Sequence, residues 1–396
     1  MDFSFSDNTK PLKPSAIREI FKSLTDPSVI SFAAGNPSPQ SFPVAQFKAF
    51  VDEILENNAS TALQYGITEG YTPLREEVLK RNKRIFDIGK DFDTAIITAG
   101  GQQGIDLTAK VLCNRGDAVI CEDPTFIGAL NAFRAHGLDT VGVPMRGSSI
   151  DPGELEATVK KTKNAKLIYL IPTFQNPTGR TMPLEVRKEC LRIAQKYGLI
   201  ILEDNPYGEL RFSGEDIPTI KSMDTEGRVV YCGSFSKILS SGMRVGYVIC
   251  HNDIASKIAV CKQVNDVHTN LLCQMVCHKF MTEFDLDAHI KMIRQLYRKK
   301  ASLMMSRLDE IGSDRIEYTK TNGGLFIWAS LFGCDDHDEF VKTLAKKKLC
   351  VVPGRTFNCD VSEPSYGFRL NYSTPTDEQI VKGVEILKNT INEIRG

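Results

Sequence analysis

The sequence lacks the features of a membrane protein, a secreted protein or a nucleic-acid-binding protein. No apolar run approaches the length needed to span a bilayer. The segment Met1 to Asn8 has neither the basic region nor the apolar core of a signal peptide. The 49 basic and 49 acidic residues give a formal net charge of zero, which argues against a nucleic acid or an anionic membrane as a partner. We therefore expect a cytoplasmic globular protein.

The sequence also lacks the cysteine spacing of a metal site. There are 11 cysteines, an odd number, and none of them forms a CxxC pair. The nearest pair, Cys273 and Cys277, has no histidine cluster to complete a set of ligands. We expect reduced thiols and no bound metal.

What the sequence does contain is a regular alternation of short apolar runs and amphipathic helical segments. Strands are predicted at 94–98, 118–121, 140–143, 166–171, 199–202 and 228–233. Strands separated by helices predict βαβ crossovers and a mainly parallel sheet. With 396 residues the chain is long for a single core. We predict an α/β fold with an N-terminal arm (1–45), a large domain (46–285) and a smaller α+β domain (286–396).

Residues able to do chemistry follow the ends of these predicted strands. The carboxyl ends of parallel strands share one edge of the sheet, and ligands bind there. The glycine-rich turn at 99–104 offers free backbone N–H groups at the start of a helix, which suit a phosphate. Ser234, Ser236 and Arg244 also suit a phosphate, and the amine of Lys237 beside them suits a Schiff base with a phosphorylated aldehyde. Each of these segments taken alone also fits an ordinary surface turn.

Taken together, three motifs resemble those of the fold type I pyridoxal-phosphate enzymes, specifically the class I/II aminotransferases. They are Asn176-Pro177-Thr178-Gly179, Asp204 with Tyr207, and Ser234-x-Ser236-Lys237 with Arg244. The resemblance covers nearly the whole chain. Four further segments are similar to the aminoadipate/kynurenine-type branch, namely 15–18, 31–35, 64–66 and 100–104. That branch includes aromatic, branched-chain and 2-aminoadipate aminotransferases.

The resemblance implies a pyridoxal 5'-phosphate cofactor and a role for each motif residue. Lys237 would hold the cofactor as a Schiff base and would then move the proton from the substrate Cα. Asp204 would pair with the pyridine nitrogen and keep it protonated. Around the ring, Asn176 and Tyr207 would bond its hydroxyl oxygen and Phe126 would stack on its face. The implied phosphate ligands are Gly101, Gln102, Ser234, Ser236 and Arg244.

The resemblance also implies how the substrate and a second subunit would be bound. Arg369 would grip the substrate α-carboxylate in a two-point fork, with Asn176 touching the same group and Gly35 lying along the substrate. Arg18 would meet a distal carboxylate, or swing aside for an apolar side chain; from local sequence alone it equally fits a solvated arginine. Tyr65 would reach the phosphate of the neighbouring subunit, which implies a homodimer with shared active sites.

We therefore expect a ping-pong aminotransferase. It would exchange the amino group between an L-amino acid (aromatic, branched-chain or 2-aminoadipate) and a 2-oxo acid such as 2-oxoglutarate. The same cofactor residues would also serve a C–S β-lyase, which needs a leaving group at Cβ and releases ammonia without an acceptor. A third interpretation is a ligand-sensing module, since related domains are fused to winged-helix regulators. Neutral charge, and the absence of a helix pair in the first ten residues, argue against it.

Overall fold

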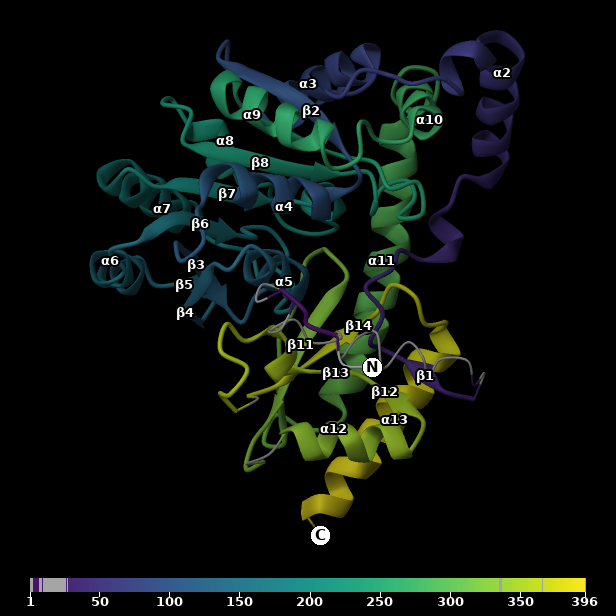
Figure 1. The fold of residues 1–396 in the computed structure, drawn as a ribbon. Coiled ribbons are helices and arrows are strands. Elements are labelled where there is room, and N and C mark those ends of the chain that lie inside the picture. Colours follow the sequence, from purple (N-terminus) through teal and green to yellow (C-terminus); the bar gives the residue numbers. More distant parts are fainter. Residues whose placement is uncertain are drawn as a thin grey trace.

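The computed structural model describes residues 3–6, 9, 26, 28–334, 337–364 and 366–395 of the chain. Within them a large eight-stranded sheet and a smaller four-stranded sheet lie at opposite ends of the long helix α11 (Leu286–Asp309) (Figure 1). The predicted α/β fold, with a large sheet and a smaller α+β part, is confirmed. The exact division at 45/46 and 285/286 stays a prediction.

The large sheet is mainly parallel, and this orientation creates the edge on which the site is built. Its strand order is β2-β9-β8-β7-β6-β3-β4-β5. The pairings make every strand except β9 and β5 point the same way. The strands are β2 (Asp93–Thr98), β3 (Ala118–Asp123), β4 (Asp139–Arg146), β5 (Ser149–Ile150), β6 (Ala165–Leu170), β7 (Ile200–Asp204), β8 (Val229–Ser234) and β9 (Gly246–His251).

Strand β9 is an element that the sequence analysis did not predict. It runs antiparallel between β2 and β8, and its first residue, Gly246, pairs with Thr98 and with Ser234. Because β9 runs the opposite way, its beginning lies at the edge where its neighbours end. Arg244, two residues earlier, is thereby carried to that edge. The serines and glycines at 240–246 are typical of a turn, so they obscured the start of the strand.

Helices cover both faces of the large sheet because its strands alternate side chains between them. On β3, for example, Val119 packs in the cluster that contains α4, α5 and α9, whereas Ile120 packs with α6, α7 and α8. The bounds are α4 (Gly101–Leu112), α5 (Ile127–Ala135), α6 (Pro152–Lys161), α7 (Leu184–Tyr197), α8 (Ile220–Met223) and α9 (Asn252–Gln263). Helices α2 (Val44–Ala62), α3 (Thr72–Phe86) and α10 (Leu271–Thr282) pack together beside this sheet (Figure 1).

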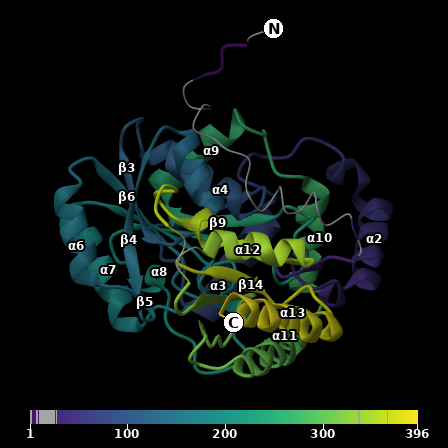
Figure 2. The same ribbon diagram turned by 90° about the horizontal axis from the view of Figure 1, so that it is seen from below.

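The smaller sheet is antiparallel, in the order β10-β11-β14-β13. Its strands are β10 (Ile316–Tyr318), β11 (Phe326–Leu331), β13 (Val352–Pro353) and β14 (Phe368–Asn371). Helices α12 (His337–Lys346) and α13 (Asp377–Arg395) lie with α11 at this end of the molecule (Figure 2). The N-terminal segment joins the same part, because β1 (Ile30–Ser31) pairs with β12 (Leu349–Cys350). In the described part of the chain, no helix is both long and apolar enough to cross a membrane.

Candidate active site

A cavity of about 300 Å³ opens at the carboxyl edge of the large sheet, against the smaller sheet. It brings together almost every residue that the sequence analysis selected. Those that line it are Gly35, Gly101, Gln102, Phe126, Asn176, Asp204, Tyr207, Ser234, Ser236, Lys237, Arg244 and Arg369. Tyr65 does not line it, and Arg18 lies outside the described residues.

Lys237 is placed in this cavity by the loop that follows β8. Its Nζ donates a hydrogen bond to the carbonyl oxygen of Gly35 at 2.8 Å. Burial, together with the nearby cations Arg244 and Arg369, lowers the pKa of its amine to about 8, although Asp204 opposes them. An amine with such a pKa is partly uncharged near neutral pH, which is the form able to attack a carbonyl carbon.

Asp204 is the last residue of β7, and its side chain is almost completely buried. Burial raises the pKa of its carboxyl to about 6, against the opposing effects of Tyr169 and Lys237. The Tyr169 hydroxyl donates a 2.7 Å hydrogen bond to Oδ2 of Asp204. Sequence reasoning missed Tyr169. The available signal was a hydroxyl inside an apolar strand, because a buried tyrosine hydroxyl requires a partner.

One end of the cavity is built to hold an anion. Helix α4 begins there, and no side chain in the described part of the chain caps its first N–H groups. The guanidinium of Arg244 and the hydroxyls of Ser234 and Ser236 lie at the same end. Gly100, with φ +77°, leaves room for the arginine, since a Cβ at this position would lie 2.2 Å from Nη2 of Arg244. Arg244 itself has φ +52°, a conformation that non-glycine residues seldom adopt.

Phe126 forms one wall of the cavity, and a second glycine allows its ring to lie there. A Cβ on Gly128 would approach the Phe126 ring to 2.4 Å and Oε1 of Gln102 to 2.5 Å. The carbonyl oxygen of Gly128 instead accepts a 2.8 Å hydrogen bond from Nε2 of Gln102. Sequence reasoning selected Phe126 and Gln102 but missed Gly128, because the contact exists only after folding.

Arg369 is a buried cation, 2 % exposed, at the side of the cavity formed by the smaller sheet. Its Nη1 donates to Oδ1 of Asn176 at 2.9 Å and its Nη2 donates to the carbonyl of Ala33 at 2.7 Å. Its Nε is buried and has no hydrogen-bond partner among the described residues. Burial lowers the pKa of the guanidinium to about 10, so it stays charged at neutral pH. The rings of Phe326 and Phe357 lie 4.2 and 5.0 Å from its central carbon.

Tyr65 lies away from this cavity, on the surface of the described chain. Its side chain is 80 % exposed, and its ring meets the ring of His268 edge-on with centroids 6.0 Å apart. Leu63 and Ile67, on either side of it, are also exposed, at 72 % and 53 %. An exposed apolar cluster of this kind is typical of a contact surface.

Comparison with known proteins identifies the family. A family model described as aminotransferase class I and II matches residues 27–387. The chain belongs to this family. It is 38 % identical to aromatic-amino-acid aminotransferase 1 of Thermococcus litoralis, over 98 % of this chain and 94 % of that protein. It is 34 % identical to the 2-aminoadipate transaminase of Thermus thermophilus, over 97 % and 95 % of the two chains.

Solved structures agree with this identification. The fold matches a kynurenine aminotransferase of Pyrococcus horikoshii, in a complex with PMP, with a TM-score of 0.95 and 36 % identity over 99 % and 98 % of the two chains. It also matches the α-aminoadipate aminotransferase of Thermus thermophilus, bound to N-(5'-phosphopyridoxyl)-L-leucine, with a TM-score of 0.89 and 33 % identity over 99 % and 98 %. This chain is therefore a fold type I aminotransferase, and its cofactor is pyridoxal phosphate.

The residues of the aminotransferase cavity fit this cofactor chemically. The uncapped start of α4 and the guanidinium of Arg244 complement the charge of a phosphate. The carboxylate of Asp204 complements a protonated ring nitrogen, and the amine of Lys237 is of the kind that binds an aldehyde. The partnerless Nε of Arg369 leaves one strong donor available in the same cavity.

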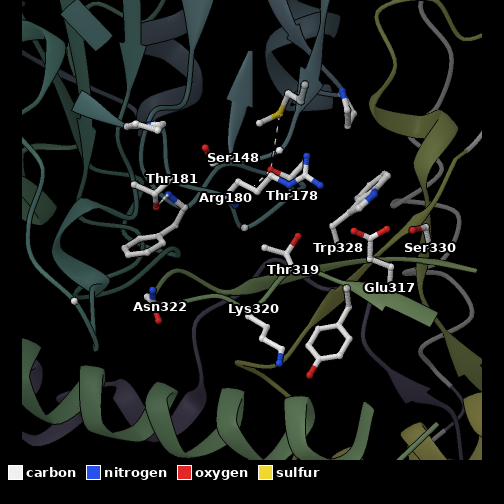
Figure 3. A pocket seen from close by; sticks show the side chains of 18 of the residues that line it. Ser148, Thr178, Arg180, Thr181, Glu317, Thr319, Lys320, Asn322, Trp328 and Ser330 are labelled. Atoms are coloured by element: carbon white, nitrogen blue, oxygen red, sulfur yellow. Dashed lines mark hydrogen bonds between the residues drawn. The ribbon is translucent and has the colours of Figure 1, made fainter. Parts of the chain in front are cut away.

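A second cavity, of about 930 Å³, lies on the other side of the turn that carries Asn176. Thr178, Arg180 and Thr181 face it from the turn between β6 and α7, and Glu317 and Trp328 face it from β10 and β11 (Figure 3). Neither Lys237 nor Asp204 lines it. The turn at 176–181 thus contributes residues to the lining of both cavities and separates them.

Proposed function

We propose that this aminotransferase exchanges the amino group between an L-amino acid and a 2-oxo acid such as 2-oxoglutarate by a ping-pong mechanism. The amino acid would be aromatic, branched-chain or 2-aminoadipate. The single observation that carries the proposal is one cavity that holds an amine with a lowered pKa, a buried carboxylate and a buried guanidinium (Lys237, Asp204 and Arg369). The names of the relatives, which specify aromatic amino acids, 2-aminoadipate and kynurenine, support the choice of substrates.

The cofactor would be held at both ends of the cavity. Ser234, Ser236, Arg244 and the first amides of α4, at Gly101 and Gln102, would bind the phosphate. Asp204 would accept a hydrogen bond from the ring nitrogen. On the ring itself, Asn176 and Tyr207 would bond the hydroxyl oxygen and Phe126 would stack on the face.

Proton movement would be the task of Lys237. When bound, pyridoxal phosphate supplies a sink for the electron pair left at the substrate Cα. The Nζ of Lys237 would accept the proton from Cα, because burial and neighbouring cations keep its amine partly uncharged. Asp204, through its charge, would hold a proton on the ring nitrogen. Tyr207 would hydrogen-bond the ring hydroxyl oxygen.

The substrate would be oriented mainly by its α-carboxylate. Arg369 would bind it through a fork of two N–H donors, and the partnerless Nε supports this assignment. Asn176, already bonded to Arg369, would touch the same carboxylate, and Gly35 would lie along the substrate. Arg18 would meet a distal carboxylate, or swing aside for an apolar side chain.

A homodimer with shared active sites completes the proposal. Tyr65 would reach the phosphate of the neighbouring site, and its exposure within an apolar surface cluster supports an interface there. Sedimentation velocity of the wild-type protein is expected to give twice the mass of one chain; a monomer that is fully active would contradict this part of the proposal.

The decisive experiment follows the visible spectrum of the holoenzyme mixed with one amino acid and no acceptor. We expect the absorbance of the lysine-bound cofactor to convert to that of the pyridoxamine form with glutamate, while one equivalent of 2-oxo acid appears. A panel of donors then ranks the amino acids. A spectrum that persists while ammonia and pyruvate accumulate from cystathionine or cysteine would instead identify a C–S lyase and refute the transaminase proposal.

A further inference from the structure

Gln175, the residue before Asn176, connects the two loops that carry the proposed site. Its Nε2 donates a 2.8 Å hydrogen bond to the carbonyl of Pro124, in the turn that leads to Phe126. Its Oε1 accepts hydrogen bonds from the backbone N–H of Thr178 at 2.9 Å and from the Thr178 hydroxyl at 2.7 Å. The side chain is 1 % exposed, so water does not compete for these bonds.

These bonds begin where the backbone pairing between β3 and β6 stops. The ladder runs from Ala118 paired with Ala165 to Cys121 paired with Tyr169. Beyond it, Oε2 of Glu122 accepts a 2.9 Å hydrogen bond from the N–H of Ile171, and the Gln175 amide makes the next connection. Side chains therefore continue the attachment of the two strands up to the edge of the cavity.

The turn after Gln175 needs such an attachment, because it has a cavity on each side. Asn176 lines the catalytic cavity, whereas Thr178 and Arg180 line the larger one (Figure 3). The turn closes on itself through Gln175 N–H to Arg180 O at 2.8 Å and Gly179 N–H to Gln175 O at 2.6 Å. Those two bonds lie within the turn and define its conformation, but they do not fix its distance from the loop that carries Phe126.

We propose that Gln175 is a positioning residue of this aminotransferase, which sets the separation between the wall of Phe126 and the wall of Asn176. Through Asn176 it also sets the position of the Arg369 fork, since Oδ1 of Asn176 accepts from Nη1 of Arg369 at 2.9 Å. The inference rests on the proposed roles of Asn176 and Phe126. Gln175 does not line the catalytic cavity, so it would act through these neighbours.

The test replaces Gln175 with methionine, which keeps the length of the side chain and removes its hydrogen bonds. We expect the Kd of the apo full-length chain for pyridoxal phosphate, from absorbance titration, to rise about tenfold. The KM for the amino donor is expected to rise by a similar factor, with a smaller change in kcat. Thr178→Val removes one of the Gln175 bonds, together with the weaker contacts of the hydroxyl with the Arg180 N–H at 3.4 Å and Sδ of Met145 at 3.9 Å. It is a milder variant with smaller expected changes in the same direction. It keeps the test valid if Gln175→Met does not fold.

The matched control is Asn82→Leu, which removes another buried amide. Asn82 donates to the carbonyl of Val78 at 2.8 Å and to the Tyr247 hydroxyl at 3.1 Å, and it does not line the catalytic cavity. We expect it to lower the melting temperature as Gln175→Met does, while Kd and KM change less than about twofold. If Gln175→Met also lowers only the melting temperature, Gln175 is merely structural and the inference is overturned.

A double variant separates this inference from the function on which it rests. On the Asn176→Ala background, Gln175→Met is expected to change KM by less than about twofold, because the group it positions is gone. A full tenfold effect on that background would overturn the inference. If Asn176→Ala alone changes neither Kd nor KM, the proposed role of Asn176 fails instead, whatever Gln175→Met does.

Discussion

The buried carboxylate of Asp204 should make the cofactor-free protein less stable than a variant that lacks the charge. Burial raises the pKa of this group from 3.8 to about 6. The unfolded chain therefore releases the proton at a lower pH than the folded chain does, and the free energy of unfolding falls as the pH rises from about 4 to about 6. A difference of about 2 units at about 1.4 kcal/mol each amounts to about 3 kcal/mol above pH 6.

Asp204→Asn removes the charge but keeps the shape and an acceptor for the Tyr169 hydroxyl. At pH 7.5 we expect the apo variant to be more stable than the apo wild-type protein by up to about 3 kcal/mol. The gain should be small at pH 4 and should vanish near pH 3, below the pKa of the carboxyl in both the folded and the unfolded chain. The same variant should bind pyridoxal phosphate weakly and lose nearly all turnover, because it cannot hold a proton on the ring nitrogen.

Urea unfolding of both apo proteins at several pH values, at one protein concentration, measures the difference directly. A gain that does not change with pH would show that the charge of Asp204 is not its cause. If the variant is less stable than the wild-type protein at every pH, the charge of Asp204 does not destabilise the folded apo protein, and the reasoning is refuted.

Four further outcomes are expected. Lys237→Ala should abolish turnover and the absorbance of the lysine-bound cofactor while the circular dichroism spectrum stays unchanged; wild-type turnover would refute the site. Tyr169→Phe should weaken pyridoxal phosphate binding about tenfold in absorbance titration, because the 2.7 Å bond that holds Asp204 is lost, and unchanged binding would contradict its role. Arg369→Ala should lower kcat/KM about a hundredfold for every amino acid, since two charge-assisted bonds disappear; a loss confined to one substrate would contradict this. Arg18→Ala should impair acidic substrates more than apolar ones in a donor panel, and an equal loss would remove its proposed role.

Part of the arrangement of the site could be predicted from sequence, because several of its residues lie at or just after the end of a strand of one mainly parallel sheet. Once the apolar runs at 118–121, 166–171 and 199–202 were interpreted as strands in βαβ units, Phe126, Asn176 and Asp204 had to lie at one edge. In the structure β3 and β7 each end two residues later than predicted, at Asp123 and Asp204. This difference does not move the three residues away from the edge. This prediction did not require the order of the strands in the sheet.

Other parts of the site depend on contacts between segments that sequence periodicity does not relate. Arg244 reaches the phosphate end because β9 runs antiparallel between β2 and β8, and no local pattern specifies that pairing. Tyr169 stands in a run of apolar residues that predicts only a buried strand, yet its hydroxyl donates a hydrogen bond to Asp204 on the neighbouring strand. Gly128 is small because the Phe126 ring and the Gln102 amide occupy the space of its missing side chain.

The sequence by itself therefore determined the fold class, the family motifs and the edge at which the chemistry lies. The fold class and the edge follow from hydrophobic period and from the direction of parallel strands, whereas the family follows from the resemblance of three short motifs. Only the tertiary structure decided which groups support the motif residues: the Tyr169 hydroxyl that bonds Asp204, and the Gln175 amide that joins the turn of Asn176 to Pro124. The physical reason is that hydrogen bonds and close contacts between distant segments depend on distances that exist only after the chain has packed.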